Sequence, residues 1–412
     1  MAEPVDLDFH VFYVAGQMWS EGLDVYDVEL YRHRTIQQAG AEWIKTSNSE
    51  EAVYVYPPQA GVLFSILSRF DFEKAFLLSM LANSGLLIIS LLLLLYILSW
   101  YRPIGWVEAA LVISFIKTSY GRVNVRSGQL GIGVAVLLLS AFILAQKRHD
   151  FAAGVFLGAV ALKPSFLPFF LLYYLLKKKY RLLWVAGLSG LLMTVLPLLL
   201  TGRSVLDLQS MWANLVGFSH VGGSNDPSPS NFYSAYLHHL EPLVYRLLNA
   251  FSPFTHLIAV AVIVLLMAFA TYLVYRTRDA NGKADCWLDF ALFSGLSLLA
   301  VYHRGYDLFL LFPALLYLYI QIFNLAEARK RLFWGTFLWV GWLALIMPED
   351  AILRLTYFWP GLVENYLIRL MAPFQGWIGL AVFSALISFK WAQLKAMVHE
   401  NRVVKSRVFS NL

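Results

Sequence analysis

The stretch Phe76–Trp100, FLLSMLANSGLLIISLLLLLYILSW, contains 25 residues and no charged side chain. About 20 such residues are enough for an α-helix to cross the hydrocarbon core of a bilayer. The whole chain of 412 residues has a similar character, with 59% hydrophobic and 14% charged residues. Soluble proteins contain on average about 45–50% hydrophobic and about 25% charged residues. The sequence therefore predicts an all-α integral membrane protein.

Eight further apolar stretches bring the predicted number of crossings to about nine. Three of them are short enough to need local thinning of the bilayer. The longer ones are Gln129–Gln146, Tyr180–Thr201, Phe254–Tyr275, Asp307–Ala326 and Pro373–Trp391, and the shorter ones are Trp106–Tyr120, Trp287–Val301 and Leu332–Met347.

The stretch Phe151–Leu176 is interrupted in its middle by Lys163-Pro164. Proline removes a helical hydrogen bond, and a lysine within the bilayer is costly unless it faces protein or water. We interpret the stretch as a re-entrant hairpin. With residues 1–75 placed outside, the inner segments then hold 18 Lys and Arg in about 52 residues, against 13 in about 169 outer residues. This is the positive-inside pattern.

This topology divides the chain into three parts: an extracytoplasmic first loop with juxtamembrane helices (1–75), a polytopic transmembrane domain (76–391) and a basic cytoplasmic tail (392–412). The single cysteine, Cys286, excludes a disulfide framework and a Cys-based metal cluster. The net charge of +6 comes without a basic tract interleaved with aromatics. A nucleic-acid partner is therefore not expected.

The candidate functional polar residues are concentrated in the predicted outer segments. Asp8 precedes a run in which Phe9, Phe12 and Trp19 recur with helical spacing, which predicts an amphipathic helix lying on the outer membrane face. Asp8 could equally be the N-cap of that helix.

Two further groups of polar residues follow in the predicted outer segments. Arg122 and Arg126 could hold a phosphate through their guanidinium forks, or could contact lipid headgroups. His303, Arg304 and Asp307 form a polar cluster at the outer end of a predicted crossing. Such clusters within membrane proteins often mark functional sites.

Several motifs, taken in their order along the chain, resemble those of glycosyltransferase family 87. The resemblance spans roughly residues 8–330. The matching motifs are Asp8-Phe-His-Val-Phe-Tyr with Ala15-Gly16, Gly22 and Tyr26-Asp27, then Tyr56-Pro57-Pro58, Gly128-Gln129, Ala161-Leu162-Lys163-Pro164, and Tyr302-His303 before Asp307.

The resemblance implies a C-type glycosyltransferase fold in the cell membrane, with its active site on the extracytoplasmic face. Polyprenol-phosphate-mannose-dependent α-1,2-mannosyltransferases belong to this family. By position, Asp8 corresponds to the family's catalytic aspartate and His303 to its functional histidine. Two features depart from the family pattern. The crossing that precedes the aspartate loop in the family is missing here, and the segment around Arg122 fits only loosely.

The residues themselves point to a donor of the same kind. Nucleotide sugars stay in the cytosol, whereas the candidate residues face outward, and the chain has no Gly-rich nucleotide fingerprint. A transferase acting outside would therefore need a lipid-linked sugar as its donor. The family resemblance implies that the lipid is a polyprenyl phosphate and that the acceptor is a lipid or glycan. We expect Asp8 to act as general base in a single inverting attack. The cations near the leaving phosphate would come from His303, Arg304, Arg122, Arg126 and Lys163, with Gln129 and Tyr56 also placed in the substrate site.

Several alternatives remain open on the sequence. Asp6-Leu7-Asp8 resembles the metal-holding Asp-x-Asp of other glycosyltransferases, although we expect no cofactor and do not favour a metal. Lys163 could simply snorkel or bridge the hairpin. The broken helix is also compatible with a transporter or flippase of lipid-linked sugar. The missing first crossing is compatible with an inactive, truncated family member.

Overall fold

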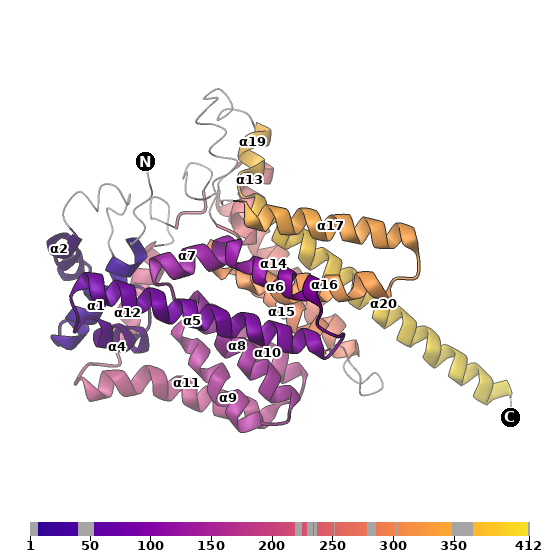
Figure 1. Ribbon diagram of the computed structural model, residues 1–412, viewed down its shortest axis with the longest axis horizontal. Coiled ribbons are helices and arrows are strands. Elements are labelled where there is room, and N and C mark those ends of the chain that lie inside the picture. Colours follow the sequence, from indigo (N-terminus) through magenta and orange to yellow (C-terminus); the bar gives the residue numbers. More distant parts are fainter. Residues whose placement is uncertain are drawn as a thin grey trace.

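The computed structural model describes residues 7–39, 53–218, 225–228, 234, 237–250, 252–277, 286–301, 303–347 and 366–410. Within these residues the only regular elements are α-helices and short 3-10 helices, which confirms the predicted all-α class. Figure 1 shows α1 (Leu7–Ser20), α2 (Val28–Ala39), α4 (Pro58–Leu67) and α12 (Asp207–Phe218) gathered at one end of the molecule, beside the beginning of α5 (Phe72–Ser99).

Five helical segments of the described chain are long and apolar enough to cross a membrane. Each coincides with one of the longer predicted spans. The prediction of nine crossings goes beyond these five. The other apolar helices have 17 residues or fewer, and α17 (Ala328–Ile346) carries Arg329, Lys330 and Arg331 in its first turn. The five segments are Phe72–Ser99 (α5), Tyr180–Leu200 (α11), Pro253–Thr277 (α14), Gly305–Phe323 (most of η4 and α16) and Phe374–His399, within α20.

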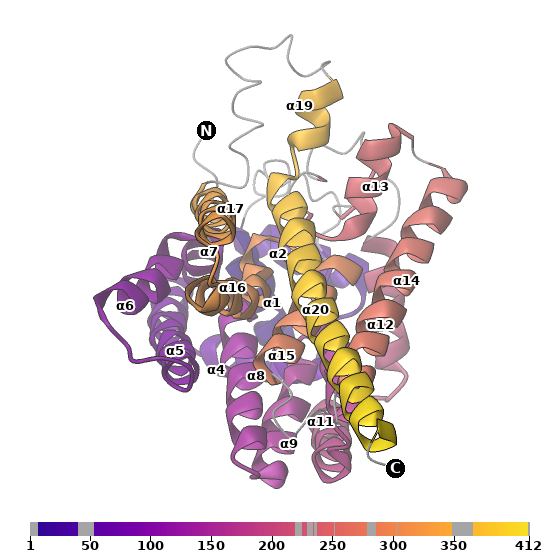
Figure 2. The same ribbon diagram turned by 90° about the vertical axis from the view of Figure 1, so that its right-hand side faces the viewer.

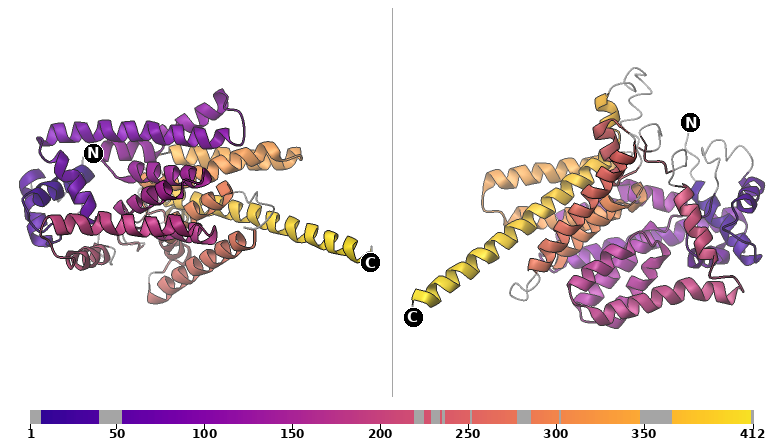
Figure 3. Two further views of the ribbon diagram at one scale, coloured as in Figure 1. Left: turned by 90° about the horizontal axis from the view of Figure 1, so that it is seen from below. Right: turned by 180° about the vertical axis from the view of Figure 1, so that it is seen from behind.

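The remaining helices complete the bundle and its outer end. Figures 1 and 2 show α20 (Phe374–Ser410) crossing the bundle beside α14 and α15, and Figure 3 shows its C-terminal part projecting beyond the other helices. The others are α6 (Trp106–Ile113), η1 (Ser114–Lys117), α7 (Ser119–Ser127), α8 (Gly131–Gln146), α13 (Leu240–Leu248), α15 (Cys286–Ala300), η4 (Gly305–Leu311), α16 (Phe312–Asn324), α17 (Ala328–Ile346) and α19 (Tyr366–Met371).

The core of the bundle is centred on α15. Every residue of α15 from Trp287 to Leu299 is buried, so this helix is surrounded by protein on all sides. Near its beginning, the buried carboxylate of Asp289 lies 2.5 Å from the ammonium groups of both Lys177 and Lys390. Buried charges require such partners, and this cluster ties α15 to α20 and to the connection that follows Leu176.

The predicted break at Lys163-Pro164 is present. The helix α9 (Asp150–Ala159) continues as the 3-10 turn η2 (Val160–Leu162), and α10 (Leu167–Leu176) begins after a turn of four residues. The chain therefore forms a helical hairpin with Lys163 at its tip. Its re-entrant position in a bilayer stays a prediction.

The prediction for α1 was right about the helix and wrong about its surroundings. From Phe9 to Ser20 only Ser20 is exposed, so α1 is buried on most sides and is not an amphipathic surface helix. The reason is a close crossing with α4: a Cβ atom on Gly16 would lie 2.5 Å from the backbone of Phe64. Glycine lets the two backbones approach, and the aromatic side chains of α1 are covered as a result.

Candidate active site

A buried ionic cluster joins the tip of the hairpin to the beginning of η4. Lys163 Nζ lies 2.5 Å from Asp307 Oδ1, and His303 Nδ1 lies 3.0 Å from the other carboxylate oxygen, Oδ2. Asp307 and His303 are fully buried and Lys163 is 8% exposed. Away from water these charges interact strongly, and each depends on the others for compensation.

Aromatic rings surround the ammonium group of Lys163. Nζ lies 4.3 Å from the ring centroid of Tyr306 and 5.4 Å from that of Phe166. Phe166 in turn stacks on His303 with 4.8 Å between the ring centroids. Cation–π contacts of this kind gain strength when the cation is desolvated. The position of Lys163 is therefore fixed by one carboxylate and two rings.

Both ring nitrogens of His303 face protein oxygen atoms. Besides the contact with Asp307, Nε2 lies 3.1 Å from the carbonyl oxygen of Ser297, in the last turn of α15, where carbonyls lack partners within the helix. The His303 carbonyl accepts a 2.9 Å hydrogen bond from the backbone N–H of His238. Burial lowers the pKa of His303 below its ordinary value, although the Asp307 carboxylate opposes this shift. The catalytic role of His303 stays a prediction. In this conformation its ring is enclosed by protein.

The other predicted cations lie outside this cluster. Arg304 is half-buried, and its Nη2 donates a 2.8 Å hydrogen bond to Asn225 Oδ1. Arg122 and Arg126 are both exposed on α7, whereas Asn124 between them is fully buried. Residues two apart on a helix lie about 200° apart around its axis. The two arginines therefore face away from the cluster, as the lipid-headgroup alternative requires.

Tyr56 and Gln129 meet on the other side of the site. The Tyr56 hydroxyl lies 3.4 Å from Gln129 Oε1, and Gln129 is buried. Next to them, Gln59 Nε2 donates a 2.8 Å hydrogen bond to the carbonyl oxygen of Ala161, two residues before Lys163. These bonds connect α4 both to the loop after α7 and to the tip of the hairpin.

Asp8 is the second residue of α1, and its side chain lies outside the described part of the structure. Its neighbour Phe9 is placed by Gly128, which has a φ of +63°. A Cβ atom on Gly128 would lie 2.7 Å from the Phe9 ring, so only glycine permits this approach. The first turn of α1 therefore lies against the Gly128-Gln129 loop.

Three residues that hold the site together were missed in the sequence. Asn124 binds the backbone of Tyr306, Gln59 binds the backbone of Ala161 near the hairpin tip, and the Ser297 carbonyl oxygen lies against the His303 ring. For Asn124 a signal existed, because helical spacing places it opposite Arg122 and Arg126. The contact of Ser297 is made by its carbonyl oxygen, which no sequence pattern indicates.

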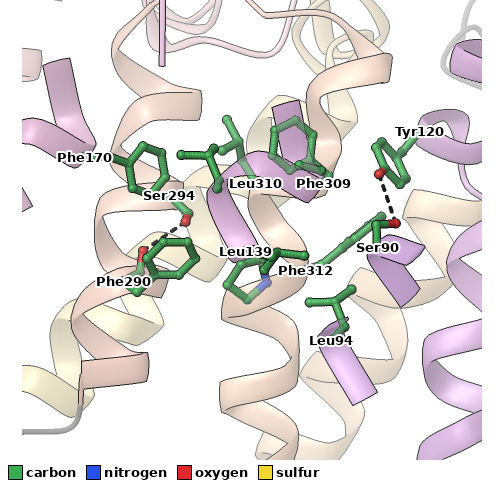
Figure 4. A pocket seen from close by; sticks show the side chains of 13 residues that line it. Ser90, Leu94, Tyr120, Leu139, Phe170, Phe290, Ser294, Phe309, Leu310 and Phe312 are labelled. Carbon is green, nitrogen blue, oxygen red and sulfur yellow. Dashed lines mark hydrogen bonds between the residues drawn. The ribbon is translucent and has the colours of Figure 1, made fainter. Parts of the chain in front are cut away.

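A small apolar cavity lies deeper in the bundle, beneath Phe309 and Tyr120 (Figure 4). Phe309 packs on Phe166 with 5.5 Å between the ring centroids, so one layer of rings separates the cavity from the ionic cluster. Its described lining carries no charged side chain, and its three hydroxyl groups, those of Ser90, Tyr120 and Ser294, are hydrogen-bonded to protein atoms. The lining residues are Ser90, Leu94, Tyr120, Ala135, Leu138, Leu139, Phe170, Phe290, Ser294, Phe309, Leu310, Phe312 and Pro313.

The described side chains do not include those of Asp6 and Asp8. Among the described side chains, no group of three or more His, Cys, Asp or Glu is arranged to hold a metal ion. The predicted Asp6-x-Asp8 motif lies outside the described side chains.

Comparison with known proteins adds one finding. No curated protein and no solved structure matches the chain. The model of glycosyltransferase family 87 matches residues 54–300, more than half of the chain. This region contains α4, Gln129, Asn124 and the Lys163 hairpin, which are parts of the site described above. The chain belongs to glycosyltransferase family 87 and is a membrane glycosyltransferase by family.

Proposed function

We propose that the protein transfers a hexose, mannose by family resemblance, from a polyprenyl-phosphate donor to a lipid or glycan acceptor on the extracytoplasmic side of the cell membrane. One observation carries the proposal: the turn of α1 that bears Asp8 and the buried cation Lys163 belong to the same end of the helical bundle. Tyr56, Gln59 and Gln129 connect them.

The distribution of charge supports an outward-facing site. Figure 1 shows the connections after α5, α8 and α10 lying away from α1 and α4. These connections carry Arg102, Lys147 and Lys177–Lys179. Lysine and arginine concentrate on the cytoplasmic side of membrane proteins, which supports an extracytoplasmic position for the end that holds Asp8 and Lys163.

The proposed reaction is a single displacement at C1 of the donor sugar. The Asp8 carboxylate takes the proton of an acceptor hydroxyl, and the hydroxyl oxygen forms a bond to C1 as the bond between C1 and the phosphate oxygen breaks. The electron pair of that bond stays on the lipid phosphate, which gains negative charge. One attack inverts the anomeric centre.

Lys163 is placed to stabilise the departing phosphate. Its ammonium group is held in one position, 2.5 Å from Asp307 Oδ1 and 4.3 Å from the ring centroid of Tyr306. A cation held rigidly where charge develops stabilises the transition state more than a mobile one does. Arg304, half-buried at the start of η4, is the second cation in reach of an outer substrate.

The test uses the purified protein in liposomes with radiolabelled polyprenyl-phosphate sugars and native membrane lipids as acceptors. We expect transfer by the wild type and a rate about 10²–10⁴-fold lower for Asp8→Asn, because a positioned base contributes that much. Asp71→Asn is the matched control, since Asp71 is exposed and caps α5 through a 3.0 Å hydrogen bond from the Lys74 N–H. Wild-type transfer by Asp8→Asn would overturn the assignment of the base.

The same liposomes separate the alternatives. Movement of the labelled lipid across the bilayer without transfer of sugar would support a flippase. The absence of both, with any donor in the panel, would support an inactive family member. Loss of transfer on adding a chelator, restored by magnesium or manganese, would show metal dependence.

A further inference from the structure

Asn124 is fully buried on α7 and connects three other segments of the chain. Its Nδ2 donates a 2.8 Å hydrogen bond to the carbonyl oxygen of Tyr306 and a 2.7 Å bond to that of Tyr120. Its own carbonyl oxygen accepts from Asn83 Nδ2 at 3.3 Å and from the Gln129 N–H at 3.2 Å. One residue thus joins α5, the Gly128-Gln129 loop and η4.

The bond to Tyr306 acts on the ionic cluster directly. Tyr306 contributes the ring that lies 4.3 Å from Lys163 Nζ, and Asp307, the next residue, contributes the carboxylate. Two of the three groups that fix the ammonium of Lys163, the Tyr306 ring and the Asp307 carboxylate, therefore extend from backbone that the Asn124 amide holds.

A glycine makes this arrangement possible. A Cβ atom on Gly131 would lie 2.6 Å from Asn124 Oδ1 and 2.8 Å from the Tyr306 carbonyl oxygen. Asn124 Oδ1 is buried and has no hydrogen-bond partner among the described residues. A buried acceptor without a partner is rare in proteins and usually has a specific reason. Here both N–H groups of the amide are directed at carbonyl oxygens, which leaves Oδ1 against Gly131.

We propose that Asn124 is a positioning residue of the transferase site. It holds Tyr306 and Asp307, and through them the ammonium of Lys163, at the place where the lipid phosphate leaves. This inference rests on the proposed function for its effect on catalysis, but its effect on Lys163 is independent of that function.

The contact between Asn124 and the Tyr306 carbonyl oxygen can be disturbed by two different substitutions. Asn124→Asp removes the two N–H donors and places a carboxylate against carbonyl oxygens, while Gly131→Ala pushes Asn124 and Tyr306 apart without changing either. Gly133→Ala is the matched control, because a Cβ atom there would meet nothing closer than Leu86 Cδ1 at 3.9 Å. Misplacement of a reacting group by about 1 Å can cost on the order of 100-fold in rate.

Kinetics provide the first readout. We expect kcat to fall at least about tenfold in Asn124→Asp and in Gly131→Ala. The KM for the donor should change less than about twofold in both. Gly133→Ala should match the wild type. The double variant should be no slower than the slower single variant, because both act on one contact. The proposal would be overturned if both single variants were folded and kept the wild-type kcat. It would also be overturned if kcat fell in proportion to thermal stability in all three variants alike.

The second readout does not require sugar transfer. Lys163 in the wild type is shielded by its carboxylate and rings, so a small amine-acylating reagent should label it slowly, as followed by peptide mass spectrometry. In Asn124→Asp and Gly131→Ala we expect the labelling rate of Lys163 to rise at least about threefold relative to that of the exposed Lys74, and in Gly133→Ala to stay unchanged. Unchanged labelling in all variants would refute the positioning of Lys163, even if the protein transferred no sugar.

Discussion

Lys163 and Asp307 are separated by 144 residues in the sequence and by 2.5 Å between Nζ and Oδ1 in the folded protein. The lysine comes from the tip of a helical hairpin and the aspartate from the 3-10 turn that begins another segment. Neither charge would be tolerated alone in this position, because an uncompensated buried charge is strongly unfavourable. The pair therefore joins the two parts of the bundle that form the candidate site.

Removing one member of this pair should destabilise the protein more than removing both. We expect Asp307→Leu to lower the free energy of unfolding by about 3–5 kcal/mol, since it leaves a buried ammonium without its carboxylate. The double variant with Lys163→Met should recover part of that loss while remaining inactive. Thermal unfolding in detergent measures both. The exposed pair Lys330–Glu327, 2.7 Å apart, is the control, and Lys330→Met should change stability by less than about 1 kcal/mol. A double variant less stable than Asp307→Leu would contradict this account.

The two arginines of α7 should matter little for the chemical step. Arg122 and Arg126 are exposed on the side opposite Asn124. Replacing both with Gln should therefore leave kcat within about threefold of the wild type, while Lys163→Gln lowers it at least about tenfold. Initial rates at saturating donor measure the difference. If the double arginine variant lost as much as Lys163→Gln, the predicted phosphate-binding role of these arginines would be supported.

Gly16 should be the least replaceable residue of the crossing between α1 and α4. Its Cβ atom would lie 2.5 Å from the backbone of Phe64, which cannot yield as a side chain can. We expect Gly16→Ala to lower the free energy of unfolding by about 1–3 kcal/mol. Gly85→Ala, on the same kind of helix but with nothing within 4 Å of the new atom, should be neutral or stabilising by up to about 1 kcal/mol. Equal stability of the two variants would show that the helices separate freely.

Glu241 should contribute to loss of stability in acid. Burial by itself raises its pKa, but hydrogen bonds with His239, Tyr245 and His256 outweigh burial and lower the pKa to about 2. An unfolded glutamate titrates near pH 4.3. The stabilisation from Glu241 is therefore fully present above about pH 5 and is lost as the pH falls toward 2.

Allowing for partial exposure, this loss amounts to about 1–2 kcal/mol between pH 5 and pH 3. Glu241→Gln should start less stable at pH 7 and lose correspondingly less over the same interval. Unfolding midpoints in detergent at pH 7, 5, 4 and 3 provide the measurement, with the exposed Glu73→Gln as control. Parallel pH curves for the wild type and Glu241→Gln would contradict the prediction.

The long helices and the broken hairpin could be predicted because their causes are local. An uncharged run such as Phe76–Trp100 requires a helix in a bilayer, and Lys163-Pro164 interrupts a helix wherever it stands. The count of crossings is less accessible, because α8 and α15 are short and apolar, and such segments are equally suited to the interior of a bundle. Glycosyltransferase family 87 was identified from the order of motifs, several of which are the glycines and prolines of these local turns.

The surroundings of individual side chains depend on partners that are distant in the sequence. The spacing of aromatics in α1 indicates a helix, but the close approach of α4 at Gly16 decides that nearly all of that helix is buried. Arg122 and Arg126 have the chemistry of phosphate ligands, but the contact of Asn124 with Tyr306 turns them outward. Pattern alone cannot distinguish these outcomes, because each is decided by which face of a helix meets its neighbour.

The hairpin that ends at Lys163 has a further consequence for tolerated changes in the chain. An α-helix rises about 1.5 Å and turns about 100° per residue. The number of residues between Asp150 and Lys163 therefore sets both the depth and the direction at which the ammonium arrives. Even one inserted alanine would shift and rotate the Lys163 ammonium away from the Asp307 carboxylate, although no residue of the site would have been replaced. Insertions and deletions in α9 should accordingly be far rarer among active enzymes than conservative substitutions on its surface.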